Sequence, residues 1–330
     1  MTRSDFALNP YVDLRTGTLH NKVGARSADE LKERENTLVN LRMTELKEDP
    51  VRGRLDFAHL KEVHRRLFQD VYDWAGQVRQ NFDAAKRDYV GGSAYAFVPS
   101  AQIHQEAARI FYDLASHDCL KGLTLAEFVP QLARLHGELN HLHAFPEGNG
   151  RTQRLFLEQV AENAGHPIDL SIGTEYRIIE ASIAQARGQH FMMERLVHEA
   201  ADADRARAIR EAINHLTEVK GHAFVAGIYI AASVPGQQYN GHLYASNGRD
   251  FIMRTDDRKL IVGHSMDLPA NLHGGDAFQF TSTVETAKLA ERAVERVEGE
   301  RKAKEVEKTQ GKEHPKKRFR GKLKDRGHER

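Results

Sequence analysis

The stretch HAFPEGNGRTQR, residues 143–154, decides how the chain folds on both sides of it. One proline and two glycines lie close together in it, and none of them continues a helix cheaply, so a preceding helix must end near Leu142. A second helix is expected to begin near Gly150 and to end at residues 165–167 (GHP), a usual C-terminal stop. The sequence therefore predicts a loop between two helices, with residues 148–151 at a helix N-terminus.

The helix before this loop has clear start and core signals. Thr124 and Glu127 have the spacing of a capping box, which marks a helix start. Apolar residues then recur at steps of four and three, which places one helix face in a core. They are Phe128, Leu132, Leu135, Leu139 and Leu142.

Other helices are predicted around this one. Ser27 begins a second capping-box spacing, Ser100 marks a third helix start, and an apolar stripe runs on from Asp56. Residues 25–216 are therefore expected to form one mainly helical domain, behind an N-terminal extension over residues 1–24.

Residues 87–99 interrupt the helical pattern. Two short runs, DYV and AYAFV, flank a Gly-Gly pair, which predicts a β-hairpin with a glycine turn. An isolated hairpin on a helical body is usually a surface flap, and a mere connector is the alternative.

After about residue 217 the apolar period changes from that of a helix to that of strands. Five strands in this short segment suggest a small β-barrel of the oligonucleotide/oligosaccharide-binding (OB) type over residues 217–284. Residues 285–330 are expected to form a charged helix and then a disordered basic tail. The predicted strands are residues 223–230, 241–245, 251–254, 260–263 and 277–280.

Composition and charge narrow the class of protein. The 330 residues are 40% hydrophobic and 29% charged, which is ordinary for a globular protein, and no apolar run is long enough to cross a membrane. With the single cysteine Cys119, an internal disulfide or a cysteine-based zinc cluster is excluded. Residues 301–330 carry 13 Lys and Arg against 5 Asp and Glu, so the rest of the chain has a net charge of −7 (35 minus 42). Such a body does not favour nucleic-acid binding, whereas the tail does.

The loop and the helix after it combine groups that suit phosphate chemistry. Free amides at a helix N-terminus bind anions, and glycines let a ligand come close. Arg151 and Arg154 lie three residues apart on one helix face, as a pair suited to phosphate oxygens. Glu147 beside them is explained by a divalent cation that bridges it to the phosphates. His143 is placed to take a proton from a nucleophile near neutral pH, so the groups together predict phosphoryl or nucleotidyl transfer.

These residues form the motif H-x-F-x-E-G-N-G-R-x-x-R, which resembles the active-site motif of the Fic (filamentation induced by cAMP) family. The stretch VYDWAG at residues 71–76, together with Arg79, resembles a second recurrent stretch of that family. The resemblance covers about residues 25–200 and implies a mainly α Fic fold, in which the hairpin at 87–99 is a flap that docks protein targets.

The resemblance also implies a role for each motif residue. His143 would be the general base that deprotonates a Ser, Thr or Tyr hydroxyl of a target protein, and Phe145 would anchor the loop in the core. Glu147 would hold Mg²⁺ on the α- and β-phosphates of ATP. The hydroxyl would attack the α-phosphorus, so the implied activity is AMP transfer with release of pyrophosphate. The residues implied to bind the phosphates are Gly148, Asn149, Gly150, Arg151 and Arg154.

The flap would hold a segment of the target by strand addition, through main-chain hydrogen bonds that depend little on sequence. A host small GTPase is a candidate target at the level of the family only. The flap residues expected at this contact are Tyr89, Val90, Gly91, Gly92, Tyr95 and Phe97.

Many Fic proteins are silenced by a helix with the sequence S/T-x-x-x-E-G/N, whose glutamate pairs with the second arginine of the motif. No Glu-Gly or Glu-Asn of this chain has Ser or Thr four residues before its glutamate; Leu31, for example, precedes Glu35. Inhibition is therefore expected from a separate small antitoxin-like protein that pairs with Arg154.

A Fic domain followed by a small barrel and a basic segment also resembles the N-terminal part of bacterial effectors exported by type IV secretion. This implies synthesis in a bacterial cytoplasm and secretion into a host cell. Those effectors usually continue into a C-terminal delivery domain, so either the chain is truncated or its tail is itself the signal.

Two other functions stay open at this point. Some Fic relatives transfer phosphate, UMP or phosphocholine, although Gly150 and Arg154 favour ATP in the usual orientation. A non-catalytic protein would instead bind nucleic acid through the barrel and the tail. The aromatic residues of the barrel segment are, however, equally explained as core.

Overall fold

The computed structural model describes residues 9–87 and 94–283, and the described residues up to Ser282 belong to one compact unit. Its α-helices are α2 (Ala28–Glu48), α3 (Phe57–Phe68), α4 (Ile103–Ser116), α5 (Leu125–Leu142), α6 (Asn149–Ala164), α7 (Glu175–Ala186), α8 (Phe191–Ala201), α9 (Ala203–Lys220) and α10 (His222–Ala226). Its strands are β1 (Val12–Asp13), β2 (Thr18–Leu19), β3 (Ala85–Arg87), β4 (Ala94–Ala96), β5 (Ile230–Ala232), β6 (Gln238–Ser246), β7 (Asp250–Thr255), β8 (Leu260–His264) and β9 (Ala277–Thr281). Single 3₁₀ turns are Ser100–Gln102, Asp118–Leu120, Leu170–Ile172 and Ser265–Asp267.

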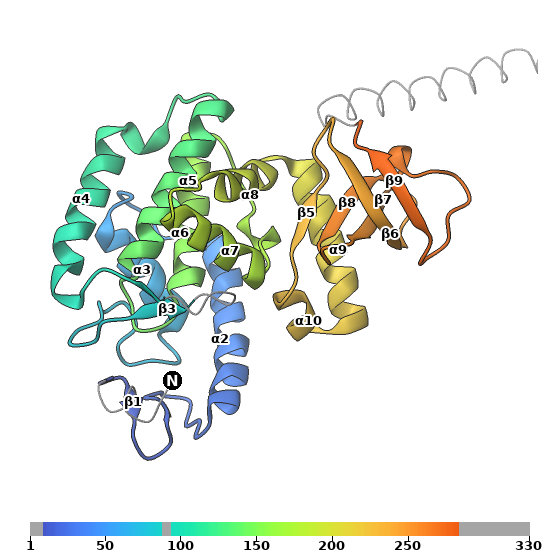
Figure 1. The fold of residues 1–330 in the computed structure, drawn as a ribbon. Coiled ribbons are helices and arrows are strands. Elements are labelled where there is room, and N and C mark those ends of the chain that lie inside the picture. The colour runs from blue at the N-terminus through green and yellow to red at the C-terminus, as the bar shows by residue number, and fades with distance from the viewer. Residues whose placement is uncertain (1–8, 88–93, 284–330) are drawn as a thin grey trace, which may run out of the picture. The chain divides into compact units, whose positions relative to one another are not determined.

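Helices α5 and α6 are at the centre of the helical part, where α3, α4, α7 and α8 pack against one or both of them (Figure 1). The apolar stripe predicted for α5 is buried along its whole length, from Phe128 to Leu142. Phe145 and Phe156 complete this main core, each at most 1% exposed. The mainly helical fold expected from the sequence is therefore confirmed.

The predicted helix starts are confirmed by their capping bonds. Thr124 N–H donates to the Glu127 carboxylate (2.9 Å), and Glu30 N–H donates to Ser27 Oγ (3.2 Å). The His59 amide donates to the Asp56 carboxylate (3.0 Å) at the start of α3. The start at Ser100 is a single 3₁₀ turn that leads into α4.

A small hairpin of β1 and β2 lies in the N-terminal extension, for which the sequence predicted no structure. Val12 pairs with Leu19, and beyond the hairpin the Lys22 amide donates to the Val71 carbonyl (2.8 Å). Strands of two residues carry no readable periodicity, because alternation needs several residues to show.

The predicted flap is also a hairpin, although its first strand begins earlier than expected. Strand β3 pairs with β4 in antiparallel register, with Ala85 opposite Ala96 and Arg87 opposite Ala94. The predicted first strand and the glycine turn, which include Tyr89, Val90, Gly91 and Gly92, lie outside the described residues.

The C-terminal strands form one five-stranded sheet in the order β5-β8-β7-β6-β9, in which only the β5–β8 pair is parallel. Both sheet faces are buried, because Ile252 and Val262 join the main core while Phe251 and Ile261 form a separate core. Among the described strands the pairing does not close into a barrel, so the OB type stays a prediction. The tail over 285–330 lies outside the described residues.

The prediction of a strand over residues 223–230 was wrong. Residues 222–226 form α10, in which Val225 packs into the main core, and the strand begins only at Ile230. Two side chains near the start of α7 hydrogen-bond to the backbone that follows α10. Thr174 Oγ1 donates to the Ile228 carbonyl (2.6 Å), and Arg177 Nη1 donates to the Ile230 carbonyl (3.0 Å). These contacts are tertiary, so a local apolar pattern does not reveal them.

Candidate active site

The loop between α5 and α6 begins and ends with left-handed backbone. His143 closes α5 with φ 42° and ψ 56°, and its amide donates to the Leu139 carbonyl (3.1 Å). Gly148 opens α6 with φ 83°. Both predicted helix boundaries are confirmed within one or two residues, and the loop turns sharply at each of them.

Arg79 fixes the position of His143 through its backbone. Its buried guanidinium donates from Nε to the His143 carbonyl (2.8 Å), from Nη1 to the Phe82 carbonyl (2.8 Å), and from Nη2 to the Val98 carbonyl. Burial lowers the pKa of Arg79, while the three carbonyls accept hydrogen bonds from its Nε, Nη1 and Nη2. One side chain thus ties the catalytic loop to the segments on both sides of the flap.

The imidazole of His143 lies flat against Phe97. The two ring centroids are 3.7 Å apart and the planes differ by 7°. Phe97 is only 6% exposed, so its side chain orients the candidate base, and its predicted contact with a target is not tested by this arrangement. Tyr95 lies opposite Lys86 in the β3–β4 pair.

Asn149 holds the loop together with its side chain. Its Oδ1 accepts from the Phe145 amide (2.9 Å), and its Nδ2 donates to the Phe145 carbonyl (2.7 Å). The first hydrogen bond of α6 is that of the Thr152 amide with the Gly148 carbonyl (3.1 Å). The amides of residues 149–151 therefore precede any acceptor inside the helix and remain suited to an anion.

His64 supports the loop from below and was missed by the sequence analysis. Its Nδ1 accepts from the Gly76 amide (2.8 Å), so Nε2 carries the proton and donates to the Glu147 carbonyl (3.0 Å). The ring also stacks on Phe145 at 3.9 Å. Burial lowers the pKa of His64 to about 3, which keeps the ring neutral with one donor and one acceptor. In sequence it is one more member of an apolar helix face.

The two glycines of the loop differ in what surrounds them. A Cβ on Gly148 would lie 2.3 Å from the Phe68 ring, and the φ of 83° also excludes most side chains. Apart from its chain neighbours and its own helix backbone, a Cβ on Gly150 would meet no atom of the described residues within 4 Å. Gly148 is therefore needed for the fold, whereas the space beside Gly150 is open to a ligand.

The two arginines also differ, although the sequence predicted an equivalent pair. Arg151 forms an ion pair with Glu35 of α2, and its Nη2 lies 3.5 Å from Glu147 Oε1. Arg154 is half-buried and makes no hydrogen bond or ion pair with any residue in 9–87 or 94–283. Burial lowers the pKa of Arg154, while the charge of Glu158 opposes that shift. A half-buried cation that makes no hydrogen bond or ion pair within the described residues is suited to an anionic ligand.

Glu147 is accessible to an ion. Its side chain is 48% exposed, and Oε1 accepts from the Gly148 amide (2.8 Å). The described residues contain no cluster of three His, Cys, Asp or Glu side chains that would hold a metal alone. A single carboxylate fits Mg²⁺ in the form that enzymes of phosphate chemistry use, in which phosphates and waters supply the other ligands.

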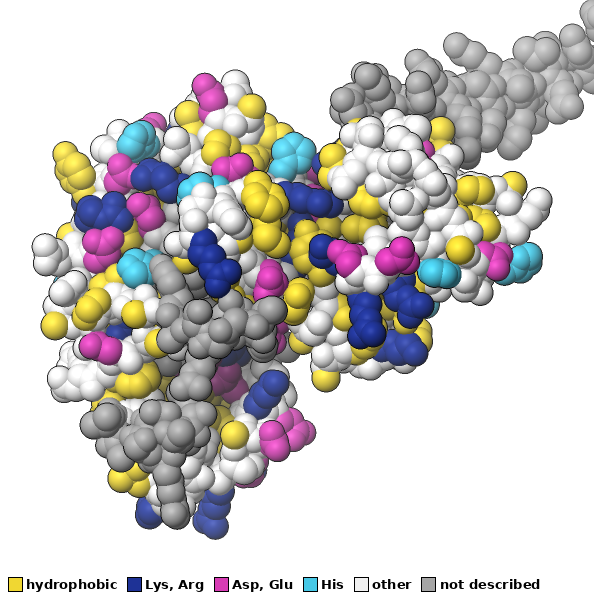
Figure 2. All heavy atoms as spheres, in the orientation of Figure 1, with side chains coloured by type: hydrophobic (Ala, Val, Ile, Leu, Met, Phe, Trp, Pro, Cys, Tyr) yellow, Lys and Arg dark blue, Asp and Glu magenta, His cyan; other side chains and the backbone are white. Residues whose placement is uncertain are grey.

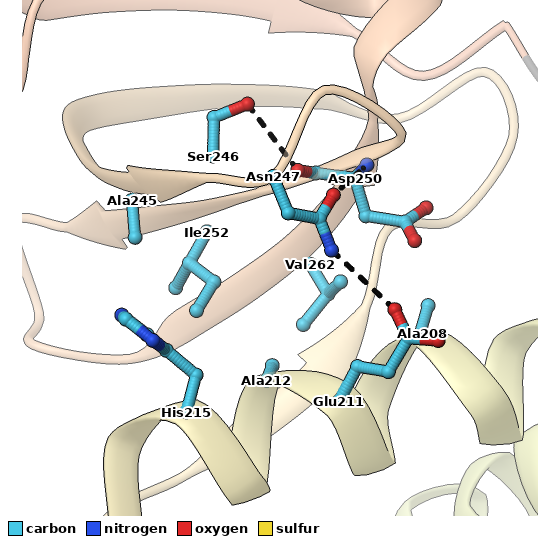
Figure 3. A pocket seen from close by; sticks show the side chains of 10 residues that line it. All are labelled: Ala208, Glu211, Ala212, His215, Ala245, Ser246, Asn247, Asp250, Ile252 and Val262. Atoms are coloured by element: carbon cyan, nitrogen blue, oxygen red, sulfur yellow. Dashed lines mark hydrogen bonds between the residues drawn. The ribbon is translucent and has the colours of Figure 1, made fainter. Parts of the chain in front are cut away.

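A cavity of about 120 Å³ lies away from this loop, between α9 and the sheet (Figure 3). Among the polar side chains that line it, Asn247 donates to Glu211 (3.4 Å), and Glu211 and Asp250 each pair with Arg207 (3.0 Å each). Carboxylates that already pair with an arginine do not attract a polyanion. This seam is therefore explained as packing between the helix and the sheet.

The charged side chains on the surface do not favour the nucleic-acid-binding alternative. On the face in Figure 2, Lys and Arg side chains lie in separate small groups among acidic and apolar ones.

In the part of the chain that the structure describes, no helix is both long and apolar enough to span a bilayer.

Comparison with known proteins relates this part of the chain to a known family. Residues 54–161 match the model of the Fic/DOC family. The chain is 34% identical to a probable protein adenylyltransferase, y4lH of Sinorhizobium fredii, over 57% of this chain and 93% of that protein. It is also 34% identical to the protein adenylyltransferase VbhT of Bartonella schoenbuchensis, over 60% of this chain. The chain spans 40% of VbhT and 52% of a second Bartonella adenylyltransferase, so it corresponds to about half of each.

Solved structures show the same relationship. The type IV secretion system effector protein BepA has a TM-score of 0.72 and 28% identity, over 83% of this chain and 96% of that one. An N-terminal Fic domain from Bartonella quintana, with bound ADP, has a TM-score of 0.54 and 30% identity over 58% of this chain and 95% of its own.

Proposed function

Because the chain belongs to the Fic/DOC family, we propose that it transfers AMP from ATP to a Ser, Thr or Tyr hydroxyl of target proteins and releases pyrophosphate. The observation that carries this proposal is Arg154, a half-buried guanidinium without a partner among the described residues, on the helix whose first-turn amides are open. Relatives named protein adenylyltransferase and the ADP-bound neighbour support a nucleotide at this place.

In this reaction each residue has one task. The open amides of residues 149–151 and Arg154 bind the phosphate oxygens, and Gly150 leaves space for them. Glu147 would hold Mg²⁺, which supplies charge neutralisation on the α- and β-phosphates when bound. Phe97 and Arg79 keep His143 in one orientation.

The chemical step is a displacement at the α-phosphorus. An imidazole nitrogen of His143 takes the proton of the target hydroxyl while the hydroxyl oxygen bonds to that phosphorus. The bond from the α-phosphorus to the bridging oxygen breaks, and pyrophosphate leaves with the electron pair. The products are a phosphodiester on the target and protonated His143, which then returns its proton to water.

The targets and the setting are further parts of this proposal. The β3–β4 hairpin would hold a target segment by strand addition, as its antiparallel pairing allows. The similarity to BepA supports secretion from a bacterium into a host cell, where a small GTPase is a candidate target. A small antitoxin-like protein would inhibit the enzyme by placing a glutamate against Arg154.

The test is a labelling reaction. The chain is incubated with Mg²⁺, a host-cell lysate and ATP labelled at the α-phosphate, and the protein bands are then separated. A labelled band is expected, and His143→Ala should reduce its rate of labelling about 10³-fold, because the base is lost while binding is kept. Transfer of label from the γ-phosphate instead would show that another group moves. Labelling that is unchanged in His143→Ala would contradict the mechanism.

A further inference from the structure

A buried carboxylate on α2 joins the phosphate-binding helix to a distant part of the chain. Glu35 is 7% exposed, and its Oε1 accepts from Arg151 Nη2. Its Oε2 accepts from the hydroxyl of Tyr72, which is 1% exposed. Tyr72 belongs to the stretch at residues 71–76, whose role the motif alone does not explain.

Arg151 is held on a second side by an aromatic ring. Its Cζ lies 4.9 Å from the centroid of the Phe68 ring, a distance typical of a cation–π contact. Among residues 9–87 and 94–283, its Nε and Nη1 make no hydrogen bond. The Nη2 end of the guanidinium is therefore fixed, while the edge with Nε and Nη1 keeps N–H donors that a ligand can use.

We propose that Glu35 and Tyr72 are positioning residues that orient Arg151 so that its open edge binds a phosphate group of the nucleotide. This inference rests on the proposed function. An arginine on a free stem loses rotamer freedom when it binds a ligand, and prior contacts remove part of that loss. Glu35 acts through Arg151 and touches neither ATP nor the target hydroxyl.

The packing of α2 favours positioning over inhibition. Glu35 lies one turn from Leu31 and from Val39, which are 6% and 1% exposed in the same core cluster as Tyr72. A glutamate that inhibits must leave the site when the enzyme becomes active, but Glu35 cannot withdraw unless this core opens. Burial and the charge of Glu35 raise the pKa of Tyr72, so its hydroxyl stays protonated and keeps its donor role.

The two roles predict opposite effects of removing the charge. If Glu35 only offset the charge of Arg151, Glu35→Gln would strengthen ATP binding. If it positions Arg151, the same change weakens binding, because the guanidinium is no longer held. The measurement is the dissociation constant of Mg·ATP, taken in the His143→Ala background so that no ATP is consumed.

Glu35→Gln is expected to weaken ATP binding about tenfold, and Tyr72→Phe about threefold, as the loss of charged and neutral hydrogen-bond partners suggests. In an Arg151→Ala background neither change should alter the constant more than about twofold, because the group that they orient is gone. An unchanged or stronger binding by Glu35→Gln overturns the proposal. An equal loss in the Arg151→Ala background overturns it too, since Glu35 would then act through the fold in general.

A matched control lies on the same helix. Arg42 of α2 forms an ion pair with Asp70 (2.6 Å), which follows α3 in the same way as Tyr72 does. Asp70→Asn should change stability without changing the ATP constant. The labelling assay separates the two proposals. If ATP binding depends on Glu35 but no label transfer depends on His143, the proposed AMP transfer is contradicted and the positioning role of Glu35 is not. If the His143→Ala parent binds no ATP, both proposals fail.

Discussion

The α5–α6 loop and the α9–sheet seam are both lined by charged and amide side chains, but they use them in opposite ways. In the seam, Arg207 pairs with the carboxylates of Glu211 and Asp250, and Asn247 donates to the same Glu211, so these charges are paired within the protein. In the loop, Arg154 and the first-turn amides have no acceptor within the described residues. Donors without an acceptor in the described residues therefore favour the loop over the cavity as the proposed phosphate site.

The rigid support of the loop is built from side chains that hydrogen-bond to backbone groups. Arg79 satisfies three carbonyls, Asn149 brackets Phe145, and His64 joins Gly76 to the Glu147 carbonyl. These hydrogen bonds all go to backbone atoms of the loop and its neighbours. The loop thus separates residues that hold it from residues that act in it.

The largest change in stability is expected at two glycines, one in the loop and one in the sheet. Gly148→Ala should lower the free energy of unfolding by about 3 kcal/mol, because the methyl group meets the Phe68 ring and the backbone is left-handed. Gly263→Ala in the sheet meets the Phe251 ring at 2.4 Å and should also destabilise the protein, although its rate of transfer per folded molecule should not change. Denaturant unfolding and the labelling rate are measured on both.

Gly150→Ala is the complementary variant for the same experiment. Its methyl group meets no atom of the described residues beyond its own helix backbone, so stability should stay within about 0.5 kcal/mol of the parent. ATP binding should weaken, because the ligand space is partly filled. If Gly150→Ala bound ATP normally, the ligand would not lie at this glycine.

The next effect concerns the two kinds of arginine. Arg154→Ala should reduce kcat/KM for ATP about 10²-fold, as loss of a preorganised cation at the phosphates implies, with little change in stability. Arg207→Ala should reduce stability by about 1 kcal/mol, since it removes the partner of Asp250, and leave kcat/KM unchanged. Initial rates and thermal unfolding of the two variants give the comparison. A loss of activity in Arg207→Ala would show that the seam takes part in the reaction.

The smallest effect is a pH dependence of stability that arises from His64. Its pKa is about 3 in the folded protein against an ordinary value of 6.5, so below pH 6.5 the unfolded chain binds a proton that the folded chain does not. Stability is therefore lost as pH falls from about 6.5 toward 3, by about 2 kcal/mol at pH 5. Unfolding of the parent and of His64→Gln is compared at pH 7 and pH 5. The variant should lose about 2 kcal/mol less than the parent between these values; equal losses would show that His64 does not cause the dependence.

Much of the fold was predictable, because its determinants are local. The capping pairs at Thr124 and Ser27, the apolar stripe of α5 and the glycines after it act within a few residues of each other. The strand predicted over residues 223–230 failed because its backbone partners come from α7, far away in the sequence.

Where α5 ends and α6 begins could be inferred from the amino acids alone, because helix termination and capping depend on neighbouring residues. The difference between the two arginines could not, because it arises from the packing of distant helices. Glu35 and Arg151 are 116 positions apart, and His64 and Glu147 are 83 apart. Hydrogen bonds across such separations depend on how whole helices pack, which no local spacing encodes.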